Sequence, residues 1–275
     1  MHSFRVEQLG RRPSKVGLST TSDYGLANVL GVAVHAIDIG LAVNCIESAI
    51  EKGEKGYVCV TGVHGVMEAQ YDRKFKTILN RAMLTLPDGM PTVWVGKLQG
   101  FRNMKRVFGP DLMTEVCARS VEKGYKHFLY GGAPGVAEQL KCRLLSKFPG
   151  ICIVGTHTPP FRALTQAEFA ELAKTIAELK PDLFWVGLST PKQERFMHEY
   201  LCRLTTKVMI GVGAAFDIHT GRIRDAPEWA KNAGLQWAHR LMQEPSRLWK
   251  RYLINNPKFI WRITLQLTGA RQYRH

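Results

Sequence analysis

The stretch HFLYGGAPGVAEQLKCRLLSKFPGICIVGT, residues 127–156, decides the fold class. Its two apolar ends, 127–132 and 151–156, have the length of buried strands, and residues 134–147 between them have the mixed pattern of an amphipathic helix. Pro134 suits the first position of that helix. Two such strands separated by a helix predict a parallel pair joined by a crossover connection.

The same alternation continues toward both ends of the chain. Four more short apolar runs predict strands, at residues 29–37, 57–63, 182–189 and 207–213. Four longer runs predict helices, at residues 38–53, 64–81, 166–179 and 191–203. Repeated units of this kind predict an α/β fold, with a mostly parallel sheet and helices on both faces.

The two ends of the chain differ from this pattern, which gives three predicted parts. Residues 1–28 are polar and weakly periodic, so we expect a mobile N-terminal leader. Residues 29–228 would form the α/β core. Residues 229–275 place Trp and Leu at helical spacing among Lys and Arg, which predicts a C-terminal helical appendage of two or three helices. No apolar run is long enough to span a bilayer, and we expect a soluble or peripheral protein.

The charge of the chain implies an anionic partner. There are 38 Lys and Arg against 23 Asp and Glu, a net charge of +15, and residues 222–274 contribute +8 of it. Such an excess favours a nucleic acid, a phosphate-rich substrate or an acidic membrane surface. Basic residues mixed with aromatic ones occur in interfacial helices, in nucleic-acid-binding segments and in packed helical caps, and composition leaves all three open.

Several motifs of catalytic or metal-binding proteins are missing. None of the six cysteines forms a C-x-x-C pair, so we expect buried, reduced thiols and no zinc site. The chain has no D-x-D, H-E-x-x-H or G-x-S-x-G motif. These absences count against metal-dependent transferases, esterases and dinucleotide-dependent oxidoreductases, and we expect neither a metal nor a cofactor.

A single acidic residue, Asp88, stands in the turn of LPDGMPTVW, residues 86–94. One interpretation is an ordinary turn residue whose carboxylate accepts hydrogen bonds from the backbone amides around it. The other is a catalytic base, because apolar surroundings raise the pKa of a carboxyl group and improve its power to take a proton.

Other polar residues follow predicted strands, where ligands bind in parallel sheets. Thr61 and His64 lie in TGVH, where Thr61 either caps a helix or donates its hydroxyl to a ligand. Gln193 and Glu194 lie in the first helical turn after GLST, and Gln193 offers both a donor and an acceptor to a sugar or a uracil edge. Asp217 follows the last strand, in GVGAAFDIHTG. The turn GGAPG is a weak phosphate-binding signal, and an ordinary turn explains it equally well.

Several long motifs appear in a fixed order from about Val29 to Phe259. They are LPDGMPTVW, RVFGPDLM, FLYGGAPGVAE, VGTHTPPF, VGLSTPKQE, IGVGAAFDIHTGRIRDAPEW and GLQWAHRLMQEPSRLWKRYLINNPKF. Together they resemble the WecG/TagA/CpsF glycosyltransferases, glycosyltransferase family 26. The resemblance implies a Rossmann-like core and an appendage that reaches the membrane and closes the site.

The resemblance also implies an activity and a set of partners. It is an inverting, metal-independent transfer of a sugar from a UDP-sugar to a polyprenyl-diphosphate-linked saccharide, in exopolysaccharide, teichoic acid or common-antigen synthesis. The enzyme would be cytoplasmic and peripheral on the inner face of the bacterial cell membrane, against an anionic surface. Nucleic acid is then not expected as a partner. The competing function is a non-catalytic nucleic-acid-binding protein that uses the basic tail. The transferred sugar, the acceptor and the oligomeric state, including a homo-oligomer, stay open.

Site residues follow from the resemblance position by position. Asp88 corresponds to the proposed base of the family, and Thr61, Arg106 and Gln193 to substrate-binding residues. The appendage arginines Arg240, Arg247 and Arg251, with the neighbouring Lys250, are expected to contact the lipid diphosphate or the membrane.

One departure from the family lies after the second predicted strand. Many members read T-x-N there, whereas this chain has Val63 in place of the Asn and His64 next. His64 either takes over the polar role or is an ordinary residue at the start of a helix.

Overall fold

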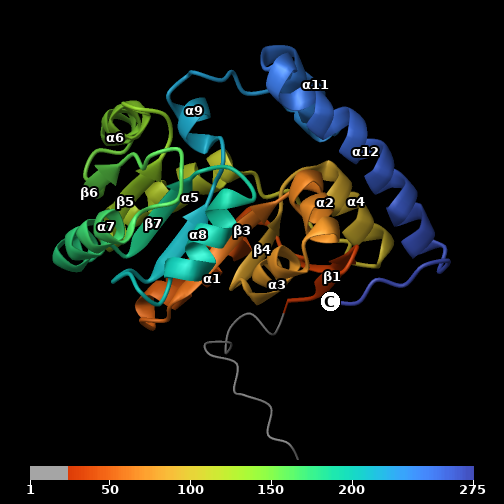
Figure 1. Ribbon diagram of the computed structural model, residues 1–275, viewed down its shortest axis with the longest axis horizontal. Coiled ribbons are helices and arrows are strands. Elements are labelled where there is room, and N and C mark those ends of the chain that lie inside the picture. Colours follow the sequence, from red (N-terminus) through yellow and green to blue (C-terminus); the bar gives the residue numbers. More distant parts are fainter. Residues whose placement is uncertain (1–23) are drawn as a thin grey trace, which may run out of the picture.

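The computed structural model describes residues 24–275, and its centre is a six-stranded parallel sheet (Figure 1). The strands are β3 (Gly56–Thr61), β4 (Leu84–Pro87), β5 (Lys126–Gly131), β6 (Cys152–His157), β7 (Leu183–Gly187) and β8 (Val208–Gly211). Their order across the sheet is β4-β3-β8-β7-β5-β6. The predicted α/β class and parallel sheet are confirmed.

Helices cover both faces of this sheet, as predicted. One face packs against α1 (Ile39–Glu51), α5 (Gly109–Lys123), α6 (Val136–Lys147) and α9 (Ala215–His219). The other packs against α2 (Val63–Tyr71), α3 (Arg73–Arg81), α4 (Met90–Leu98), α7 (Gln166–Leu179) and α8 (Lys192–Tyr200). Because side chains alternate along a strand, Trp185 enters the first layer and its neighbour Phe184 the second, and both are fully buried. The sheet is therefore apolar on both sides.

The predicted strand at residues 29–37 is wrong, because a hairpin occupies that region. Strands β1 (Leu26–Val29) and β2 (Val32–His35) pair antiparallel. Leu30 and Gly31 form the turn with φ angles of 52° and 79°, the positive values that a tight two-residue hairpin requires. Leu30 is fully buried, so the turn has none of the usual polar signals. The hairpin begins within the predicted leader, while residues 1–23 lie outside the described part of the chain.

The helices differ from the predictions in two further respects. The helix expected at residues 64–81 is two helices, α2 and α3, separated at Asp72, whose carboxylate accepts hydrogen bonds from the amides of Lys74 and Phe75. The helices α4 and α5 were not predicted, and each has a proline in its first turn, Pro91 and Pro110.

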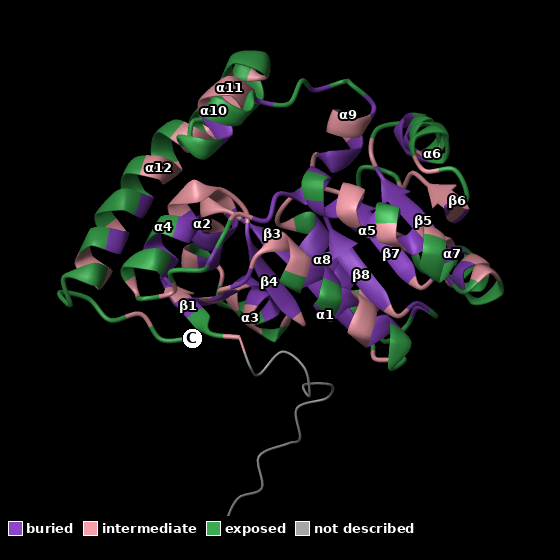
Figure 2. Ribbon diagram, turned by 180° about the vertical axis from the view of Figure 1, so that it is seen from behind, coloured by how far each residue is buried: buried purple, intermediate pink, exposed green. Residues whose placement is uncertain are grey.

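The C-terminal appendage consists of α10 (Glu228–Asn232), α11 (Gln236–Gln243) and α12 (Pro245–Leu267), which agrees with the predicted two or three helices. Figure 2 shows that much of its surface is exposed. Phe259 and Ile263 of α12 are nevertheless buried in the layer that contains α2. The appendage is thus part of the folded unit.

The end of the chain is attached to the β1–β2 hairpin. The Gln266 amide accepts a hydrogen bond from Leu30 N (2.8 Å) and donates one to Asn28 O (2.7 Å). Asn28 Nδ2 in turn donates to Tyr273 O (2.7 Å). These bonds fix α12 across the α2 side of the core.

The cysteine and membrane-span expectations can be compared with residues 24–275. Cys45, Cys59 and Cys117 are buried as expected, but Cys142 and Cys202 are exposed, so the expectation of six buried thiols is wrong. Among the described helices, none combines the length and apolar composition that a bilayer span requires.

Candidate active site

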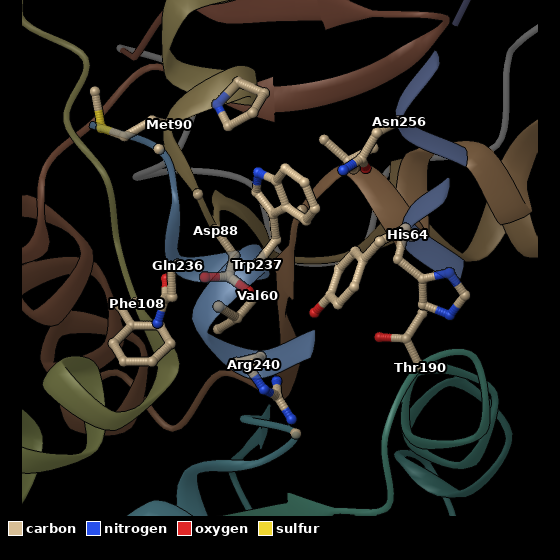
Figure 3. Close-up of a pocket in the computed structure, with 18 of the residues that line it drawn as sticks. Val60, His64, Asp88, Met90, Phe108, Thr190, Gln236, Trp237, Arg240 and Asn256 are labelled. Carbon is tan, nitrogen blue, oxygen red and sulfur yellow. The ribbon is translucent and has the colours of Figure 1, made fainter. Parts of the chain in front are cut away.

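The carboxyl ends of four neighbouring strands, β4-β3-β8-β7, open into a cavity of about 590 Å³ (Figure 3). Loops that follow these strands form one wall. The helices α11 and α12 form the opposite wall, so the appendage covers the sheet edge. Predicted site residues that line the cavity are Asp88, His64, Gln193, Arg240, Arg247 and Arg251. The cavity therefore joins residues that lie far apart in the sequence.

Asp88 is held at the end of β4 by its backbone. Thr61 of β3 and Pro87 of β4 are paired in the sheet, and Asp88 N donates to Thr61 O (3.0 Å). The next residue, Gly89, is the N-cap of α4 and has a φ angle of 98°. No hydrogen bond within the described residues engages the Asp88 carboxylate, so it does not cap its own turn. The carboxylate faces the cavity.

Burial raises the pKa of Asp88 to about 6. The positive charges of Arg106 and Arg240 oppose this shift, and the negative charge of Asp111 adds to it. A carboxyl group with a pKa near neutrality combines a populated base form with a useful affinity for a proton. Its place at the cavity and its raised pKa make Asp88 a candidate general base.

Gly62 leaves the space that the Asp88 turn occupies. A Cβ atom at Gly62 would lie 2.5 Å from Asp88 O, a backbone atom that cannot move without shifting the turn. We expect Gly62→Ala to displace the carboxylate and to lower kcat between about tenfold and 10²-fold, because misplacement by an ångström is enough for that loss. The overpacking should also lower the free energy of unfolding by about 1–3 kcal/mol, measured by urea denaturation.

Gly40→Ala in α1 is the matched control for this substitution. A Cβ atom there meets its nearest neighbour, Asp38 Oδ1, at 3.6 Å, an ordinary contact. Activity should be unchanged and the protein slightly more stable, since Ala favours a helix over Gly. Equal activity of the two variants would show that the contact of Gly62 with the turn does not position Asp88.

Three arginines of the appendage face the cavity from the wall opposite the strands. Arg240 and Arg247 approach Glu244 at 3.4 and 2.6 Å. Arg251 makes no ion pair with any described residue, and burial and the neighbouring arginines lower its pKa. Arg240 Nε is buried without a hydrogen-bond partner among residues 24–275. Because Glu244 is the only carboxylate of residues 24–275 that forms ion pairs with these three guanidinium groups, this wall is suited to bind an anion.

The other predicted cations lie outside the cavity lining. Arg106 is largely buried, donates to Gln236 Oε1 (2.9 Å) and lies 3.5 Å from Asp111. It therefore acts on Asp88 through its charge. Lys250 is exposed and contacts the ring of Trp249. Of two adjacent residues in α12, Arg251 turns inward and Lys250 outward.

The polar residues after β7 form a hydrogen-bonded network, in which Thr190 and Gln193 line the cavity whereas Glu194 does not. Gln193 Oε1 accepts from Gly213 N (3.0 Å), and its Nε2 donates to Glu194 Oε1 (3.1 Å). Thr190 Oγ1 donates to the same Glu194 oxygen (2.7 Å). Burial raises the pKa of Glu194, and its Oε2 has no partner among the described residues. Gln193 thus joins the β7 and β8 loops and keeps only one free N–H for a ligand.

Thr61 is the last residue of β3, and His64 lies in the first turn of α2. Thr61 is buried, its hydroxyl has no hydrogen-bond partner in the described chain, and it does not line the cavity. Burial and the nearby Arg251 lower the pKa of His64 to about 4, so the imidazole is neutral at pH 7. A neutral histidine can offer a hydrogen bond to a sugar without adding charge.

Asp217 lies outside the cavity lining, 3.5 Å from the side chain of Arg222. Several cavity residues were not identified in the sequence. They are Gln236 and Trp237 of α11, and Tyr252, Asn255 and Asn256 of α12. The spacing of Tyr252, Asn255 and Asn256, three and four residues apart, shows that they share a helix face. The sequence alone does not indicate which face of α12 packs against the core.

No group of three or more His, Cys, Asp or Glu side chains within residues 24–275 is arranged to hold a metal ion. The cations that line the cavity are arginines and a buried lysine, Lys231, which pairs with Asp225 and Glu228.

Comparison with known proteins finds similarity over most of the chain. The Glycosyl transferase WecG/TagA/CpsF family matches residues 27–273. A Bacillus spizizenii (strain W23) protein, N-acetylglucosaminyldiphosphoundecaprenol N-acetyl-beta-D-mannosaminyltransferase, is 32% identical over 219 residues, 79% of this chain and 82% of the relative. A Bacillus subtilis (strain 168) protein of the same name is 32% identical over 188 residues, 68% of this chain and 71% of the relative. The family match includes the strand ends and the appendage.

Proposed function

Because this chain belongs to the WecG/TagA/CpsF glycosyltransferase family, we propose that it transfers a sugar from a UDP-sugar to a polyprenyl-diphosphate-linked saccharide, with inversion at the anomeric carbon. The observation that carries the proposal is the Asp88 carboxylate, which has no hydrogen-bond partner among residues 24–275 and faces a cavity that arginines line from the other side. The two Bacillus relatives are named for transfer to a lipid-linked N-acetylglucosamine. A saccharide on a polyprenyl diphosphate is therefore the proposed acceptor.

In the proposed reaction Asp88 takes the proton of an acceptor hydroxyl. The hydroxyl oxygen attacks the anomeric carbon from the face opposite UDP, and the bond from that carbon to the phosphate oxygen breaks. UDP leaves with the electron pair, the new glycosidic bond has the inverted configuration, and the proton stays on Asp88 until solvent removes it. The raised pKa supports this role, because a carboxylate whose conjugate acid is weaker takes a proton more readily.

Negative charge that develops on the leaving diphosphate needs stabilisation. The guanidinium groups of Arg240, Arg247 and Arg251 could provide it without a metal, since each presents fixed donors toward the cavity. We therefore propose that the transfer is metal-independent.

The test is release of UDP from a panel of UDP-sugars in the presence of a polyprenyl-diphosphate-linked acceptor. UDP-N-acetylmannosamine comes first, because the relatives are named for that sugar. Acceptor-dependent UDP release that persists with EDTA supports the proposal. If no UDP-sugar gives acceptor-dependent release, the proposed function is wrong, and if EDTA abolishes it, the metal-independent mechanism is wrong.

The raised pKa of Asp88 predicts an acidic limb in the pH profile. We expect kcat/KM to fall tenfold for each pH unit below about 6, because a folded-state pKa raised to about 6 means that the base form is lost on acidification through that value. His64, with a pKa of about 4, stays neutral in this window. UDP binding, measured by calorimetry over the same range, controls for loss of affinity. A flat kcat/KM profile between pH 5 and 7 would contradict the role of Asp88.

We further propose a peripheral location on the inner face of the cell membrane, with the appendage toward the lipid. Its exposed side has large apolar residues, Trp249, Leu253, Ile254 and Trp261, between basic ones. Interfacial helices have this composition, with apolar groups at the headgroup boundary and cations near anionic lipid.

A further inference from the structure

A second cavity, of about 440 Å³, lies on another face of α12. Its lining residues are Tyr71 from the end of α2, Lys258, Trp261, Arg262 and Leu265 from α12, and Arg271 from the segment after it. None of them lines the cavity that contains Asp88. The two cavities are therefore separate, although α12 contributes to both.

The three cations of this second cavity have no acidic partner in the described part of the chain. Lys258, Arg262 and Arg271 make no ion pair within 4.0 Å of a described Asp or Glu, unlike Arg240 and Arg247 in the first cavity. Their contacts are with aromatic rings. Lys258 Nζ and Arg262 Cζ lie 5.9 and 5.3 Å from the centre of the Tyr71 ring, and Arg271 Cζ lies 5.2 Å from the centre of the Tyr273 ring. The recess thus holds three positive charges that an anion could neutralise.

Apolar side chains surround these charges and reach into solvent. Tyr71 and Trp261 are 61% and 65% exposed, and Ile254, one turn before Lys258 on the same side of α12, is 43% exposed. Cations beside exposed aromatic and aliphatic groups match a phosphate group at the boundary of an apolar phase. A nucleic acid would satisfy the charges but would leave Ile254 in water.

We infer that this second cavity binds the phosphate of an anionic phospholipid headgroup, with Lys258, Arg262 and Arg271 as its ligands and Tyr71 holding the cations in place. Trp261 and Ile254 then insert beside the headgroup. The inference rests on the proposed membrane location and deepens it, because it replaces general attraction to a charged surface with one defined recess.

The test compares binding to phosphatidylcholine vesicles with and without phosphatidylglycerol. We expect wild-type protein to prefer the phosphatidylglycerol vesicles, and Arg262→Gln to weaken that binding about fivefold. Tyr71→Leu, which changes no charge, should weaken it about two- to fivefold through loss of the cation–π contacts. Arg143→Gln on α6 is the matched control, since Arg143 is an exposed arginine outside both cavities.

Three results would overturn the inference. One is an equal loss for Arg143→Gln and Arg262→Gln, which would mean unspecific attraction. Another is binding of soluble glycerol phosphate as tight as that of the vesicles, which would assign the recess to a free phosphate ester. The third is tighter, Arg262-dependent binding to an oligonucleotide.

Transfer to a detergent-solubilised acceptor separates this inference from the proposed function. Both Arg262→Gln and Tyr71→Leu should keep wild-type transfer there and unfold at the wild-type temperature. If transfer is normal and neither substitution changes vesicle binding, the inferred headgroup site is wrong and the proposed function stands. If the wild-type protein shows no transfer, the proposed function is wrong, independently of the result of the vesicle binding.

Discussion

Asp88→Asn is expected to lower kcat by about 10²–10⁴-fold, the usual contribution of a general base. The substitution keeps the size of the side chain and the backbone bond from Asp88 N to Thr61 O, and removes the negative charge together with the ability to take a proton. UDP release at saturating donor and acceptor measures kcat, and UDP affinity should change little. Near-normal turnover would exclude Asp88 as the base.

Stability measurements show whether such a loss comes from catalysis or from unfolding. The pKa of Asp88 is raised to about 6 in the folded protein, so the charged carboxylate destabilises the fold as pH rises from about 4 through 6. At pH 7.5, Asp88→Asn should therefore leave the free energy of unfolding unchanged or raise it by up to about 3 kcal/mol. The gain should disappear below about pH 4.

Asp38→Asn is the chemical control for the same experiment. Asp38 is the N-cap of α1, where its carboxylate accepts from Leu41 N, and Asn caps a helix equally well. Activity and stability should both stay near wild type.

Local periodicity was enough to predict most of the fold. The helix predicted at residues 166–179 has the same ends as α7. Its signals, a Thr165–Glu168 capping box and an amphipathic pattern, are local to the segment. The β1–β2 hairpin was missed because its turn, Leu30–Gly31, is as apolar as the strands around it. Because Leu30 and Asn28 of this hairpin bind Gln266 of α12, the attachment of the appendage was missed with it.

The site was predictable in part for a topological reason. Parallel strands place their carboxyl ends at one sheet edge, so residues after them, such as Asp88 and Gln193, could be expected to meet. No comparable rule predicts which residues of the appendage helices face the cavity. Whether Lys250 or Arg251 faces the cavity depends on how α12 is rotated against the core, and that is fixed by the distant burial of Phe259 and Ile263.

That rotation also bears on the competing interpretation of the basic tail. Arg240, Arg247 and Arg251 converge on a cavity, where a nucleic acid would need them spread along an open surface. Their convergence favours a compact anion such as a diphosphate.

Arg251→Gln should therefore lower kcat by about 10²–10³-fold, the usual loss when one group that stabilises developing negative charge is removed. Arg251 is the cavity arginine without an ion pair among the described residues, so the substitution frees no carboxylate. Its charge should also hold UDP, and calorimetry should show UDP affinity about tenfold weaker. Arg251→Lys should restore part of the activity, because it keeps the charge but not the paired N–H groups.

The same variant distinguishes the two diphosphates of the proposed reaction. Weaker UDP binding with an unchanged acceptor KM would place Arg251 at the donor, and the reverse pattern would place it at the lipid-linked acceptor. Arg143→Gln, which removes an exposed guanidinium far from the cavity, should change neither. If Arg251→Gln keeps the wild-type kcat, UDP affinity and acceptor KM, the diphosphate is neutralised elsewhere. Arg240→Gln and Arg247→Gln should then be measured in the same way, since these two arginines are the other guanidinium groups that line the cavity.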